Sequence, residues 1–127
     1  NKTDKNRNME TSKLFNYDNL LNYVRGNAVL AAKIQKLIIE ELPKEMLKME
    51  EALKNKEWEK VGAIAHKIKP NIQMCSNQSL YEFVLNLEKD GKNKNQTETI
   101  PGRVAELKKN TEQLLGEMKE NMVSKAI

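Results

Sequence analysis

Apolar side chains recur every three or four residues along most of this chain, and that spacing restricts its fold more than any other feature. A period of this kind puts the apolar residues on one face of an α-helix, whereas a half-buried strand alternates strictly. The same segments are rich in Leu, Lys, Glu, Met, Ala and Gln, which favour helix. No segment shows a convincing strand pattern. The sequence therefore predicts an all-α fold.

The pattern predicts one short helix followed by four longer ones. The short helix spans about 18–25, with Asp18 as its cap and Gly26 as its stop. The next and longest spans about 27–54 and contains Pro43, which we expect to kink the helix. The others are expected over about 57–75, 77–89 and 101–122, with Asp90 and Gly91 ending the second and a polar loop over 92–99. These elements predict an antiparallel four-helix bundle with a short extra N-terminal helix.

The helical spacing also predicts which side chains form the core. In the longest helix these are Leu30, Ile34, Leu37, Ile38, Leu42, Met46, Met49 and Leu53. In the helix over 57–75 they are Trp58, Val61, Ala65, Ile68, Ile72 and Cys75. In the last helix they are Val104, Leu107, Thr111, Leu114, Leu115 and Met118. The single cysteine falls on such a stripe, which indicates a small core residue.

Of the 127 residues, 39% are hydrophobic and 31% charged, which indicates one small domain stabilised by apolar packing. Residues 1–13 are polar and are predicted to be a disordered tail or linker, which leaves 14–124 as the helical domain. No segment reaches the roughly 18–20 consecutive apolar residues of a membrane span. We therefore expect no membrane contact by this domain and a cytoplasmic location.

The charges are nearly balanced, with 22 basic and 18 acidic residues finely mixed along the chain. A nucleic-acid-binding helical protein would show a segregated basic stripe interleaved with aromatic residues, and only 5% of these residues are aromatic. The charge pattern therefore argues against nucleic-acid binding and is typical of solvated helix surfaces.

The only histidine, His66, lies in the middle of the helix predicted over 57–75. On a helical wheel its direction is roughly 130° from the centre of the apolar stripe, so the ring is expected to point outward. Gly62 and Ala63 lie one turn before it and leave the ring uncovered. Lys69 lies on the same face, three residues on, where its ammonium can stand beside an anion attached to the ring.

Two residues near His66 break the rules of a helix interior. Gly62 costs about 1 kcal/mol relative to alanine, and Pro70 costs about 3 kcal/mol. Local conflicts of this kind are expected where function is carried. An exposed histidine is otherwise an ordinary surface residue, and that interpretation stays open at this point.

The run His66-Lys67-Ile68-Lys69, with Ala65 before it and Leu80 and then Leu87-Glu88 on the following helix, resembles the histidine-containing phosphotransfer (HPt) domain of multistep two-component phosphorelays. The resemblance covers about 18–122. Pro70 departs from the family pattern, which usually has glycine there. Asn71, Gln73 and Met74 also stand where many members carry smaller residues.

The resemblance implies that His66 accepts a phosphoryl group on Nε2 from a receiver-domain aspartate and relays it to another receiver aspartate. Lys69 would stabilise the phosphoryl charge. The receiver would supply the aspartate and a divalent metal, so this chain is expected to need no cofactor and no metal site. The domain would be a phosphocarrier without autonomous kinase activity.

The implied partners are receiver domains of response regulators or hybrid histidine kinases. Ala63, Lys67, Pro70 and Gln73 are candidate binding residues, together with Gly62, whose missing side chain would admit the partner's loops. The domain is expected to be a monomer, as a separate protein or as the C-terminal part of a membrane-anchored hybrid sensor kinase. The alternative function is a non-catalytic docking module that binds a receiver or other protein without being phosphorylated, and Pro70 beside the histidine is its main support.

Overall fold

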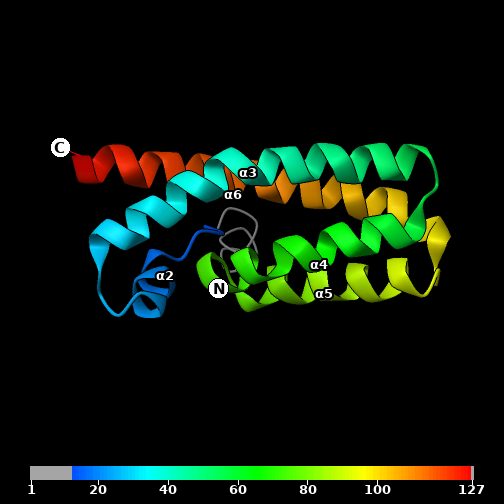
Figure 1. The fold of residues 1–127 in the computed structure, drawn as a ribbon, viewed down its shortest axis with the longest axis horizontal. Coiled ribbons are helices and arrows are strands. Elements are labelled where there is room, and N and C mark those ends of the chain that lie inside the picture. The colour runs from blue at the N-terminus through cyan, green and yellow to red at the C-terminus, as the bar shows by residue number, and fades with distance from the viewer. Residues whose placement is uncertain (1–12, 127) are drawn as a thin grey trace, which may run out of the picture.

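The computed structural model describes residues 13–126, which form α-helices joined by short turns, with no strand in that range (Figure 1). The predicted tail lies outside the described residues except for Lys13, which precedes the first helix. The elements are α2 (Tyr17–Tyr23), α3 (Ala28–Lys54), α4 (Trp58–Cys75), α5 (Gln78–Lys92), the short 3-10 helix η1 (Thr97–Thr99) and α6 (Ile100–Ala126).

The four long helices lie side by side and alternate in direction, with α4 and α5 packed as one pair and α3 and α6 as another (Figure 1). The chain is thus an antiparallel four-helix bundle with a short extra N-terminal helix, as the sequence predicts. At one end α3 and α6 run past α4 and α5, and α2 lies there beside α3 (Figure 1). In the same view α3 changes direction along its length, as expected for a helix that contains a proline.

Three helices begin at asparagines that cap them. The side chains of Asn16, Asn27 and Asn77 each accept a hydrogen bond from the backbone N–H three residues on. Asn16 therefore replaces Asp18 as the cap of α2, and Asp18 lies in its first turn. Gly26 follows α2 with a φ of 81°, a left-handed conformation that glycine adopts without strain.

The end of α5 differs from the prediction. The helix continues through Asp90 and Gly91 to Lys92, and Gly91 is buried against α4 instead of ending the helix. The last helix also runs further than predicted, from Ile100 to Ala126. For α5, packing against α4 decides the helix boundary, which local sequence signals place only approximately.

The core follows the predicted stripes except at the start of α3. The apolar positions of α6, including Thr111, are buried, and so is the α4 stripe apart from half-buried Trp58. Leu30 and Leu37, however, are 41% and 58% exposed, while Ala31 and Ile38, the next residues along α3, are buried, so the buried face of α3 lies to one side of these leucines. Buried Gln35 lies there instead and donates a hydrogen bond to Asn121 across the α3–α6 contact.

Candidate functional site

His66 projects from the outer face of α4, and its side chain is 69% exposed. The opposite face of α4 is buried through Val61, Ala65, Ile68 and Ile72. The predicted outward direction of the ring is therefore confirmed. This helix holds the imidazole at the surface on a rigid support, because its other face packs into the core.

Glu88 on α5 holds both His66 and Lys69. Its Oε2 lies 2.6 Å from Nδ1 of His66, and its Oε1 lies 2.6 Å from Nζ of Lys69. An ionised carboxylate only accepts hydrogen bonds, so this contact places a proton on Nδ1. A neutral ring that is protonated at Nδ1 carries its free lone pair on Nε2. The contact thus leaves Nε2 as the ring nitrogen with a free lone pair.

The neighbouring basic groups stabilise the negative charge of Glu88. Burial raises the pKa of this carboxyl group, but hydrogen bonds and charge from Lys69 and His66 outweigh that effect and hold the pKa below its usual value. The side chains of Glu88 and Lys69 are only 17% and 18% exposed, so both are packed against the protein. Lys69 is on the same side as the ring, as predicted, and the carboxylate fixes its position.

Gly62 and Gly91 let α4 and α5 approach closely enough for these contacts. A Cβ added to Gly62 would lie 2.7 Å from the backbone nitrogen of Lys92 and 2.9 Å from the carbonyl oxygen of Glu88. A Cβ on Gly91 would lie 2.8 Å from the nitrogen of Gly62. We expected the missing side chain of Gly62 to make room for a partner's loops. The structure corrects this: the space is filled by the backbone of α5.

A hollow of about 330 Å³ lies beside the ring, and it extends from α4 to the end of α5. Ala63, a candidate binding residue, is exposed and lines this hollow. Gly62 also lines it, although the residue is buried. Lys92, also exposed, contributes a second basic group near the histidine, in addition to Lys69. The residues that line the hollow are Glu59, Gly62, Ala63, His66, Glu88 and Lys92.

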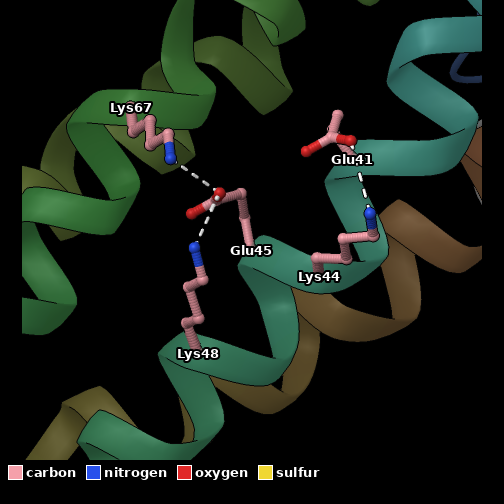
Figure 2. A network of polar contacts seen from close by, with 5 residues as sticks. All are labelled: Glu41, Lys44, Glu45, Lys48 and Lys67. Carbon is pink, nitrogen blue, oxygen red and sulfur yellow. Dashed lines mark hydrogen bonds and ion pairs between the residues drawn. The ribbon is translucent and has the colours of Figure 1, made fainter.

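Lys67 turns to the other neighbouring helix. Its Nζ lies 2.8 Å from Oε2 of Glu45 on α3, and Nζ of Lys48 lies 3.4 Å from the same oxygen (Figure 2). Glu45 is only 8% exposed, while both lysines are largely exposed. The hydrogen bond from Lys67 lowers the pKa of Glu45 and, with the charges of both lysines, outweighs the opposing effect of burial. Lys67 therefore ties α4 to α3, a contact that the sequence did not indicate.

Pro70 and Gln73 lie further along α4, and both are exposed. Gln73 lines a different hollow, next to α2, where its backbone carbonyl accepts a hydrogen bond from Asn19. The structure does not bring its side chain into the hollow beside His66. Cys75 is fully buried, and burial raises the pKa of its thiol to about 12, which keeps it an unreactive core residue.

Glu88 and Lys92 are the site residues that the sequence did not assign. The pair Leu87-Glu88 was part of the motif, but nothing local indicates that its carboxylate reaches a histidine 22 positions earlier. Lys92 falls in the range 92–99, which the sequence predicts to be a polar loop, whereas the structure places it at the end of α5. Only the close packing of α4 on α5 brings these residues to the ring.

The described residues thus define a helical bundle that displays one histidine on the surface of α4, held by a carboxylate from the adjoining helix α5. Comparisons with protein-family models and with curated proteins find no match. A solved structure is similar: the crystal structure of the HPT domain from the Hpt sensor hybrid histidine kinase from Shewanella. The similarity has a TM-score of 0.76 at 18% sequence identity and covers 86% of this chain and 93% of that chain. The chain therefore has the fold of an HPt domain.

No helix among residues 13–126 is long and apolar enough to cross a membrane.

Proposed function

We propose that this domain is a phosphocarrier in which Nε2 of His66 accepts a phosphoryl group from a receiver-domain aspartate and passes it to a second receiver aspartate. The observation that supports the proposal most is the contact between Nδ1 of His66 and Glu88, which directs the lone pair to the exposed nitrogen. The HPt fold agrees with this role.

The transfer needs little chemistry from this chain. The lone pair of Nε2 forms a bond to phosphorus as the bond between phosphorus and the aspartyl oxygen breaks, and the aspartate leaves as a carboxylate. The ring becomes positively charged, and its Nδ1 proton stays hydrogen-bonded to Glu88, whose negative charge offsets it. The reverse step, onto another aspartate, restores the neutral ring.

Basic groups next to the ring would stabilise the phosphoryl oxygens. Glu88 holds Lys69 beside His66. Lys92 lines the same hollow as the histidine ring. Phosphoryl transfer depends mainly on such positioning and charge, while the receiver would supply its aspartate and a divalent cation. Ala63 and Pro70 are the exposed residues that we assign to the receiver-docking surface.

The setting that we propose is a cytoplasmic phosphorelay, because the similar solved structure is described as part of a sensor hybrid histidine kinase. The partners would then be receiver domains of response regulators or of hybrid kinases.

The test is transfer of label from a receiver domain phosphorylated on its aspartate. We expect the domain to gain an acid-labile, base-stable phosphate that mass spectrometry under neutral conditions places on His66. His66→Gln should abolish labelling while leaving the helical circular dichroism spectrum unchanged, because the ring is exposed. Lys60→Gln is a control at an exposed position of the same helix outside the hollow beside His66, and it should retain labelling.

The same experiment decides the alternative role as a docking module. In that case a stable complex would form with the phosphorylated receiver, the label would stay on the receiver, and binding would survive His66→Gln. Retention of label in a complex of this kind would contradict the proposed carrier function.

A further inference from the structure

A second hollow lies between the first half of α3 and the end of α6, on elements that do not carry His66. Its volume is about 530 Å³, and it shares no lining residue with the hollow beside the histidine. In Figure 1 this end of the α3–α6 pair extends beyond α4 and α5, with α2 below it. We call this hollow the α3–α6 groove, and its apolar lining includes Val29, Ala32 and Met122.

The apolar surface of the groove is open to solvent. Val29 is 69% exposed, and the neighbouring Leu30 and Val123 are 41% and 65% exposed. The start of α3 and the end of α6, which carry these residues, extend beyond α4 and α5 (Figure 1). Exposed apolar side chains in and next to a groove are typical of an interaction surface.

The charged groups along the groove are all basic. Among the described residues, Lys33, Lys36 and Lys125 line it, and no aspartate or glutamate does. Within residues 13–126 none of the three lysines forms an ion pair, although Nζ of Lys125 lies 4.2 Å from the centre of the Tyr17 ring. The groove therefore has a mainly apolar lining, which includes the hydrogen-bonded pair Gln35 and Asn121, and a rim whose charged side chains are lysines.

This charge pattern separates the candidate occupants. A second copy that docked groove to groove would bring its lysines against these lysines, which opposes association. The chain's own residues 1–12 contain one large apolar residue, Met9, and more basic than acidic groups: Lys2, Lys5 and Arg7 against Asp4 and Glu10. Neither occupant complements both the floor and the rim.

We propose that the α3–α6 groove binds an amphipathic helix of another protein, with carboxylates on both sides of its apolar face. A helix lays apolar side chains at i, i+3, i+4 and i+7 into such a groove, and its flanking residues meet the rim. A concave floor between two helices suits a rod-shaped helix better than a flat bilayer. The site is independent of the phosphoryl chemistry at His66.

The probe for this proposal is a designed helical peptide of about 18 residues with a leucine face flanked by glutamates. Titrated into the ¹⁵N-labelled full chain, it should shift the amide signals of Val29, Ala32 and Met122 and leave those around His66 unchanged. The same peptide with lysines in place of the glutamates should bind about tenfold more weakly or not at all.

Charge reversal tests the rim. Lys33→Glu combined with Lys36→Glu should weaken binding of the glutamate peptide by about tenfold and favour the lysine peptide instead. Lys54→Glu combined with Lys60→Glu changes the net charge equally at exposed positions outside the groove, and it should leave binding unchanged.

Equal binding of both peptides, or shifts outside the groove, would overturn the proposal. So would concentration-dependent dimerisation that shifts these same signals, binding to phosphatidylglycerol vesicles in place of the peptide, or shifts at the groove when residues 1–12 are deleted. These readouts need no receiver domain, so they stand apart from the outcome of the phosphotransfer assay.

Discussion

His66 and Lys67 are neighbours in the sequence, yet they reach carboxylates on opposite sides of α4. His66 contacts Glu88 on α5, and Lys67 contacts Glu45 on α3. Each carboxylate is largely buried and held by two basic side chains, and each has a lowered pKa. The two sites are therefore built on the same plan.

They differ in what the second partner can do. Both partners of Glu45 are lysines: Lys67 ties α4 to α3, and Lys48 lies one turn further along α3 (Figure 2). One partner of Glu88 is an imidazole, whose side chain is 69% exposed. A buried carboxylate thus stabilises a helix contact in one case, and in the other it orients the ring that we propose as the phosphoryl acceptor.

The largest expected effect separates the two carboxylates by activity. Glu88→Ala should slow phosphoryl transfer to His66 about 10- to 100-fold, because the ring loses the acceptor that holds its proton on Nδ1. Ring ¹⁵N chemical shifts should show the Nδ1-protonated tautomer giving way to a mixture. Glu45→Ala, measured well below its unfolding temperature, should transfer at nearly the rate of the unaltered chain. Equal slowing of both variants would contradict the distinction.

Substitution at the glycine contact between α4 and α5 should have the next largest effect, on both stability and transfer. Gly62→Ala is expected to destabilise the domain by about 1–3 kcal/mol, since its Cβ would meet backbone atoms of α5. It should also slow transfer, because it pushes Glu88 away from the ring.

Gly116→Ala provides the matched control for that change. No atom lies within 4 Å of its added Cβ, so it should stabilise α6 by about 0.5–1 kcal/mol. Urea unfolding of both variants measures the difference. A neutral Gly62→Ala would show that the two helices can separate without strain.

The Glu45 site should appear in the pH dependence of stability. Its pKa in the folded chain is below the ordinary value of 4.5, so its contribution is complete above that pH and is lost as pH falls through the lowered pKa. Glu45→Gln should therefore cost about 1–2 kcal/mol at neutral pH, and this cost should shrink in acid. Urea unfolding at several pH values measures it, and a cost that does not change with pH would show that the charge of Glu45 contributes nothing.

The smallest effect distinguishes the two lysines of Glu45. Both are largely exposed, so each ion pair is expected to contribute between about 0.2 and 1 kcal/mol. Lys67→Met should cost more than Lys48→Met, because its contact is 2.8 Å instead of 3.4 Å and joins two helices. Thermal unfolding at low and high salt measures both. A larger loss for Lys48→Met would reverse the assignment.

The sequence alone determined the helices and the outward direction of His66. Both follow from a local period of apolar residues, because a helix of known pitch fixes which side chains share a face. The buried stripe of α4 and the helix count agree with the structure for that reason. The start of α3 does not, since Leu30 and Leu37 fit the period but are 41% and 58% exposed, while the next residues, Ala31 and Ile38, are buried.

Tertiary structure decided what the histidine touches. Gly91 is a stop signal by local rules, but packing against Gly62 keeps it inside α5. The same contact brings Glu88 to His66 across 22 positions of sequence. The α3–α6 groove likewise depends on tertiary structure, because it lies where α3 and α6 extend beyond α4 and α5. Contacts between helices depend on how closely the helices pack. The spacing of apolar residues within one helix does not determine that distance.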